Sequence, residues 1–155
     1  MPDRPVRAIL GRRRLGPALV AAGPDETARE AARRMAETCR GNLLVVEDGR
    51  ALGLFTERDL LERVVAAGRD PARTRLHEVM RAEPATIEAD APVREAILRM
   101  DTDELRHLVV VEGERVLGVL SSRDIPVLEL GNVAEELYER HRMVERPGNK
   151  SAAYA

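Results

Sequence analysis

Two short stretches of this sequence match each other: Gly53-Leu54-Phe55-Thr56-Glu57-Arg58-Asp59 and Gly118-Val119-Leu120-Ser121-Ser122-Arg123-Asp124. Each begins with an apolar segment typical of a buried strand and continues into a polar segment able to start a helix. In both, a glycine stands three positions before a hydroxyl residue, and an Arg-Asp pair closes the stretch. This recurrence within one chain predicts a repeated unit.

The repeat extends on the N-terminal side of both stretches. The shift that places Asp25 on Asp90 aligns residues 25–59 with residues 90–124 without a gap and gives 15 identical pairs. Met35/Met100 is another of these pairs. Chance does not produce this agreement, so we treat the chain as two copies of one unit.

Each copy has the pattern of a β-α-β-β-α unit. The helical segments carry apolar residues at i, i+3, i+4 and i+7, which predicts one buried face: Ala28, Ala31, Ala32 and Met35; Val93, Ala96, Ile97 and Met100. The expected strands are residues 19–22, 43–47 and 51–55 in copy one and 85–87, 108–112 and 116–120 in copy two. The paired strands are nearly continuous apolar runs, which favours burial on both faces.

We therefore predict an α/β protein in which two β-α-β-β-α repeats pack on each other, because one unit cannot bury its apolar faces alone. A further helix is expected over residues 132–144, capped by Asn132, with an apolar stripe of Val133, Leu137 and Tyr138. The expected organisation is a basic arm or short helix over 1–16, repeats over 17–68 and 76–130, a linker over 69–75, and a C-terminal helix with a frayed tail over 131–155.

Composition excludes several classes of function. The chain includes one cysteine and three histidines, which excludes a disulfide framework and a cysteine-rich zinc site. The net charge is −2 and aromatic residues make up 2%, so sites that stack bases on several rings are excluded. No apolar run approaches the roughly 20 residues that span a membrane. Residues 15–22 follow three arginines like a short signal sequence, but the repeat needs them as a strand, and we predict a cytoplasmic protein.

The duplicated stretch has the chemistry of a nucleotide site. Gly53 and Gly118 allow close approach of a ligand to the backbone. The hydroxyls of Thr56 and Ser121 can cap a helix or bind a phosphate, and an aspartate three residues later can accept both hydroxyls of a ribose. Hydroxyl and acid at this spacing also form a capping box. Spacing alone leaves both interpretations open.

The duplicated unit resembles the CBS domain pair, or Bateman module. The resemblance covers about residues 4–126 and rests on both Gly-x-x-Thr/Ser-x-x-Asp elements, on Asp25/Asp90 and Met35/Met100, and on residues 106–110 before the second strand. Residues 6–10 resemble the opening of small stand-alone bacterial members. The resemblance implies a pseudo-twofold unit with two clefts that bind adenosine-containing ligands such as AMP, ADP, ATP, NAD or S-adenosylmethionine, often within a homodimer.

Carried onto this sequence, the resemblance gives each site residue an expected role. Asp59 and Asp124 would hold ribose, and the residues expected to bind phosphate are Thr56, Ser121, Arg58, Arg123 and His107. The residues expected to border the adenine or allow its close approach are Gly53, Gly118, Thr86, Leu43 and Leu108. No catalytic or metal-binding residue is expected, and no cofactor is obligatory.

The two copies differ where the clefts should lie. Pro126 follows Asp124 by two residues and removes an N–H from the final helix, so it can bend or shorten that helix. Thr86 has no threonine counterpart in residues 19–22. Copy one has Gly41-Asn42 where copy two has Arg106-His107, so the clefts should differ in charge.

The function predicted is a non-enzymatic sensor that binds an adenine nucleotide and changes its dimer geometry or a partner contact. One alternative is a ligand-free module for dimerisation or protein interaction, with the motifs acting as helix caps. A second alternative is nucleic-acid contact through the arginine-rich residues 1–16. An enzyme is not expected because the sequence supplies no evident general base, metal site or nucleophile, and no membrane partner is expected.

Overall fold

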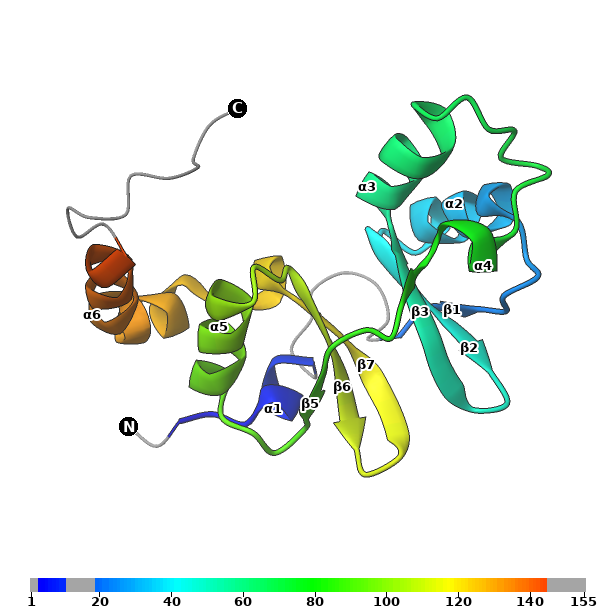
Figure 1. The fold of residues 1–155 in the computed structure, drawn as a ribbon. Helices are drawn as coiled ribbons and strands as arrows, with labels where there is room; N and C mark the ends of the chain where they lie inside the picture. The colour runs from blue at the N-terminus through cyan, green and yellow to red at the C-terminus, as the bar shows by residue number, and fades with distance from the viewer. Residues whose placement is uncertain (1–2, 11–18, 145–155) are drawn as a thin grey trace.

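The structure is a computed structural model of the chain and describes residues 3–10 and 19–144. It contains two similar units, each a small β-sheet with helices on its outer face (Figure 1). The first unit has a sheet of order β1-β2-β3-β4, and the described part of the second has a sheet of order β5-β6-β7. The α/β repeat architecture expected from the duplication is thus confirmed.

The first unit comprises β1 (Ala21–Ala22), α2 (Ala28–Glu37), β2 (Asn42–Glu47), β3 (Arg50–Thr56), α3 (Glu57–Asp59), the π-helix η1 (Leu60–Val65), α4 (Leu76–Val79) and β4 (Arg81–Ala82). Its first strand pairs parallel with β2, and the other pairings are antiparallel. Helix α2 begins at a capping box formed by Thr27 and Glu30. The turn between β2 and β3 uses positive φ at Asp48 and Gly49, as a tight hairpin requires.

The second unit comprises β5 (Thr86–Glu88), α5 (Val93–Thr102), β6 (His107–Glu112), β7 (Arg115–Ser121) and the 3₁₀ turn η2 (Ser122–Asp124). Two helices outside the repeat join it, α1 (Val6–Leu10) and α6 (Val127–Val144). Both hairpins carry a register irregularity at the same place, between Val45 and Val46 in one and Val110 and Val111 in the other. The duplication thus includes a deviation from regular pairing.

Alternation along the strands divides the core into three layers. Leu43 and Phe55 point to the helices of the first unit, and Leu108 points to those of the second. Between the sheets lies a separate cluster formed by Leu44, Leu54, Val109 and Val119, which are at most 6% exposed. The strands are therefore buried on both faces, as their apolar runs predict.

Each unit is completed by a short helix from a segment that precedes the other repeat. Val6 of α1 donates its backbone N–H to Ala91 of the second unit at 2.9 Å, and Leu76 of α4 donates to Glu26 of the first at 2.9 Å. The α1 and α4 side chains pack into the cores of these same units. The boundary expected at residue 76 therefore separates sequence repeats, whereas the packed first unit continues through β4. Residues 69–75, expected as a linker, hydrogen-bond to the start of α2 and bury Thr74.

The C-terminal helix differs from its prediction. It begins at Val127, so position 132 lies inside α6 and not before its first turn. Pro126 comes directly before this helix and stops the motif turn after Asp124, which is the shortening expected from the proline. In α6, Val133 is buried against the second unit, whereas Tyr138 is 64% exposed and leaves the expected stripe.

The basic N-terminal segment forms a packed helix where the structure describes it. Arg4 pairs with Glu129, and Arg7 pairs with Asp90 and Glu112, so these two arginines are neutralised by the second unit and α6. Residues 11–18, with Arg12, Arg13 and Arg14, lie outside the described residues, as does the expected frayed tail beyond residue 144. No helix in the described parts of the chain has the length and apolarity needed to cross a membrane.

Candidate functional site

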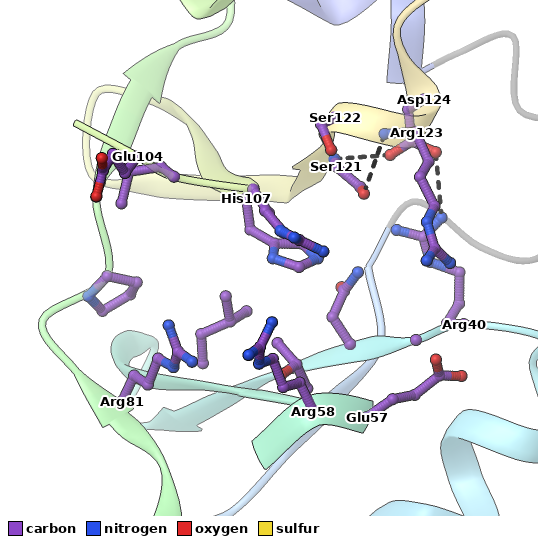
Figure 2. Close-up of a pocket in the computed structure, with 18 of the residues that line it drawn as sticks. Arg40, Glu57, Arg58, Arg81, Glu104, His107, Ser121, Ser122, Arg123 and Asp124 are labelled. Atoms are coloured by element: carbon purple, nitrogen blue, oxygen red, sulfur yellow. Dashed lines mark hydrogen bonds and ion pairs between the residues drawn. The ribbon is translucent and has the colours of Figure 1, made fainter. Parts of the chain in front are cut away.

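A cleft of about 1030 Å³ opens between the two units where β3 and β7 end (Figure 2). Its walls include both copies of the duplicated motif: Thr56, Glu57 and Arg58 from the first; Ser121, Ser122, Arg123 and Asp124 from the second. The resemblance implied two clefts, but both motif ends line this single cavity. One bound molecule can therefore contact both copies.

Both motifs form capping boxes at the cleft. In the first copy, Asp59 Oδ2 accepts hydrogen bonds from the backbone N–H of Thr56 at 3.0 Å and from its hydroxyl at 2.9 Å. In the second copy, Asp124 Oδ2 accepts from the backbone N–H of Ser121 at 2.8 Å. The capping interpretation of the spacing is thus realised in both copies. Whether each aspartate can also bind a ribose depends on the other groups that its carboxylate contacts.

Asp59 has no exposed side-chain surface and does not line the cleft. Its second oxygen, Oδ1, accepts a hydrogen bond from Arg81 Nε at 2.9 Å, and Arg63 Nε lies 3.6 Å from the same atom. Both carboxylate oxygens therefore have partners within the first unit. In this conformation Asp59 cannot reach a ribose, contrary to the role that the resemblance implies for it.

Asp124 is placed differently, because it lines the cleft and its side chain is 16% exposed. Arg40 Nη1 lies 3.6 Å from Asp124 Oδ1, across the boundary between the two units. The Arg40 side chain is itself only 8% exposed and also contacts the carbonyl of Val119 at 3.5 Å. The second motif thus presents its carboxylate to the cleft beside a buried cation.

Gly53 permits a close approach, but by the chain's own backbone. A Cβ at this position would meet the carbonyl oxygen of Arg81 at 2.9 Å and the sulfur of Met80 at 2.5 Å. Strand β4 can pair with β3 only because position 53 has no side chain. The glycine therefore lets β4 approach β3 and places Arg81 at the cleft wall, while Gly53 itself is not among the residues that line the cleft.

The cleft carries several arginines: Arg40, Arg58, Arg81, Arg106 and Arg123. Arg58 and Arg81 extend from the first unit toward the second, whereas Arg123 lies beside Arg40 (Figure 2). Arg58 pairs through Nε with Glu62 at 2.7 Å. Carboxylates also line the cavity, so its cations are spread along the walls and do not form one block.

His107 projects into the cleft from the start of β6 (Figure 2). Burial lowers the pKa of His107 from 6.5 to about 4, although Asp124 and Asp59 act in the opposite direction. The imidazole is therefore neutral at physiological pH. It can donate one hydrogen bond to a phosphate or a base, but it does not supply the positive charge expected of a phosphate-binding histidine.

The family model of the CBS domain matches residues 13–66 and 76–125. The chain belongs to the CBS-domain family. It is 31% identical over 109 residues to the CBS domain-containing protein YhcV of Bacillus subtilis, a match that covers 70% of this chain and 77% of that protein. CBS pairs of this kind are generally regulatory modules.

Two further proteins are similar to this chain over most of its length. An uncharacterized protein of Methanopyrus kandleri is 31% identical over 124 residues, and the match covers 77% of this chain but 63% of that protein, less than two thirds of its length. A CBS domain protein from Pyrobaculum aerophilum, whose structure is complexed with AMP, has a TM-score of 0.72 and 28% identity. The match covers 84% of this chain and 98% of that chain.

Several residues expected to border the adenine in the CBS pair lie elsewhere. Leu43 and Leu108 are fully buried against the helices of their own units, and neither lines the cleft. Strand alternation explains this difference, because the preceding residues, Asn42 and His107, face the cleft instead. Thr86 is exposed on β5 outside the cleft lining, and Gly118 is buried opposite Val110 in the sheet.

Two arginines that shape the CBS cleft were missed from the sequence. Arg40 stands after Cys39, whose positive φ follows the C-cap of α2, Thr38. Arg81 lies in β4, outside the aligned repeat. The one available signal was the pairing of Cys39-Arg40 with Glu104-Leu105 in the repeat alignment, which places a cation in copy one only. Cys39 is exposed at the cleft.

Proposed function

We propose that this CBS pair is a regulatory module that binds an adenine nucleotide in the cleft between its two repeats. The observation that carries the proposal is the convergence of both motif ends on one cavity with a partly exposed aspartate, Asp124. The AMP bound to the Pyrobaculum aerophilum protein supports this class of ligand. Ligand binding across the two units would change their relative position, which gives a regulatory signal.

In the proposed complex the second repeat binds the nucleoside. Asp124 accepts hydrogen bonds from the ribose hydroxyls in addition to the one from Ser121, since the two oxygens of a carboxylate can accept several donors at once. Arg123 and the Ser121 hydroxyl are assigned to phosphate, whereas the Thr56 hydroxyl donates its proton to Asp59 Oδ2 in this conformation. Neutral His107 acts as a hydrogen-bond donor or acceptor.

Calorimetric titration of the purified protein with AMP, ADP, ATP, NAD and S-adenosylmethionine tests this proposal. We expect saturable binding of at least one adenine nucleotide and a loss of about 10–100-fold in affinity for Asp124→Ala, because a charge-assisted hydrogen bond is removed. Asp25→Ala is the matched control, since Asp25 is 86% exposed and lies outside the cleft lining. Flat titrations for every ligand, or equal affinity of the Asp124→Ala variant, would reject the proposed site.

A second proposal concerns the homodimer. Leu61 and Val65 of η1 stand one helical turn apart, are 61% and 59% exposed, and form an apolar ridge on the surface of the first unit. We assign this ridge to a second copy of the chain, since a two-fold axis would place Leu61 of each copy against Val65 of the other. The dimer would join the two chains through their first CBS repeats.

Light scattering after size exclusion tests the dimer. The protein should elute with twice the mass of a single chain, and Leu61→Glu should give the monomer mass because a carboxylate would be buried without a partner. Leu130→Glu is the matched control on α6, at a leucine that is 38% exposed. A monomeric wild-type protein, or dissociation only with Leu130→Glu, would place the interface elsewhere.

A further inference from the structure

We propose that the cleft takes a single ligand with an extended phosphate chain, whose nucleoside lies on the second repeat and whose outer phosphates reach Arg58 and Arg81 of the first. This inference rests on the proposed function and names the ligand more narrowly. It predicts that affinity rises with the number of phosphates, and that each chain binds one nucleotide and not two.

The two motif aspartates have different surroundings, and only one of them can bind a nucleoside in this cleft. Two equivalent nucleoside sites would need both carboxylates at the cavity, yet only Asp124 lines it. Asp59 is fully buried and holds Arg81 through its Oδ1 atom. In the first repeat the aspartate is therefore a positioning residue for a cation, whereas in the second it faces the cavity. The duplicated motif has two different tasks.

Arg58 and Arg81 make similar hydrogen bonds. Each uses its Nε for a carboxylate, Glu62 in one case and Asp59 in the other. Among the described residues, neither makes a hydrogen bond through its terminal nitrogens. The two side chains are 61% and 53% exposed and line the cleft together. Each guanidinium thus offers its terminal N–H groups to an anion, which matches the two-pronged recognition of phosphate.

The direction of the ligand follows from where these groups lie. Arg58 and Arg81 extend from the first repeat toward His107, and the Asp124 motif lies on the opposite wall (Figure 2). Because His107 is neutral, it separates the two ends without adding charge. A nucleoside held at Asp124 therefore directs its phosphate chain across the cavity, and a longer chain approaches the arginine pair more closely. A cavity of about 1030 Å³ accommodates such an elongated ligand.

Titration of adenosine, AMP, ADP and ATP into the same protein at fixed salt tests the inference. The wild-type protein should bind ATP roughly tenfold or more tightly than AMP, with one site per chain. Arg58→Met and Arg81→Met should each lower ATP affinity by about 10-fold, lower AMP affinity less, and leave adenosine unchanged. Methionine keeps the apolar stem while removing the charge.

Two controls separate this effect from loss of folding or of net charge. Arg50→Met removes the same charge from the β2–β3 hairpin, away from the cleft, and should leave the preference for ATP intact. Within the described residues, the ion-pair partner of Arg58 is Glu62, whose side chain is 49% exposed, so Arg58→Met retains a folded protein even if Arg81→Met unfolds the first repeat. Two sites per chain, equal affinities for AMP and ATP, or an unchanged preference in Arg58→Met would overturn the inference while leaving nucleotide binding intact. No binding of any nucleotide would instead refute the proposed function.

Discussion

Asp59→Ala should lower the free energy of unfolding by about 3–4 kcal/mol, whereas the equivalent Asp124→Ala should cost less, about 2 kcal/mol. The two substitutions remove the same side chain from the same motif. Their expected effects differ because the first carboxylate is fully buried and accepts a direct hydrogen bond from Arg81, whereas the second is partly exposed and lies 3.6 Å from Arg40. The pair therefore compares an aspartate closed off inside the first unit with one that lines the cleft.

The large cost at Asp59 comes from the groups that lose their partner. The backbone N–H of Thr56 is buried and would lack its acceptor, and the Thr56 hydroxyl would lose the carboxylate 2.9 Å away. Arg81 and Arg63 would both lose the carboxylate oxygen between them. An unsatisfied buried donor costs about 1–3 kcal/mol by itself. At position 124 one cap is lost together with the contact to Arg40 Nη1 at 3.6 Å, which is longer than the 2.9 Å hydrogen bond from Arg81 to Asp59, so the expected loss is smaller.

Urea unfolding followed by circular dichroism measures both effects in the ligand-free protein. Asp59→Asn is the informative second variant, because its amide oxygen can still accept from Thr56 but cannot neutralise Arg81. We expect its stability to lie between those of the wild type and Asp59→Ala. Equal losses for Asp59→Ala and Asp124→Ala would contradict the different environments of the two aspartates. They would also contradict the proposal that the nucleoside binds at Asp124 and its phosphates at the first repeat.

The repeated fold could be predicted because its signals are local and duplicated. Apolar periodicity in α2 and α5, and the runs that became β2 and β6, each occur twice at one fixed shift. The sequence did not predict that α1 packs on the second unit and α4 on the first. Val6 and Leu76 occupy equivalent positions in the structure, but the shift that places Asp25 on Asp90 does not place Val6 on Leu76. The two short helices therefore fall outside the repeat alignment.

The motif residues could be predicted from the sequence, but the different burial of the two motif aspartates could not. Identical Arg-Asp pairs at 58–59 and 123–124 gave no indication that one aspartate would be closed off. The difference comes from Arg81, which reaches Asp59 through a strand pairing that depends on Gly53. A contact between distant segments is not visible in a repeat alignment, because the alignment compares each copy with the other and not with what packs against it.

His107 should make the protein less stable as the pH falls from 6.5 toward 4. Its pKa is about 4 in the folded protein, below the ordinary value of 6.5 that applies when the chain is unfolded. The unfolded chain therefore binds the proton first, and stability is lost progressively as the pH falls through this range. Since one pKa unit corresponds to about 1.4 kcal/mol, the loss should reach about 3 kcal/mol at the acidic end.

The variant His107→Asn isolates this contribution, because copy one carries Asn42 at the equivalent position. Carboxylates also titrate in this range, so the quantity to compare is the difference in unfolding free energy between variant and wild type, measured by urea titration between pH 4 and 7.5. The difference should shift in favour of the variant by about 3 kcal/mol as the pH falls. A difference that stays constant with pH would mean that the imidazole is solvated, and that the cleft around Asp124 and Arg40 is wetter than its burial implies.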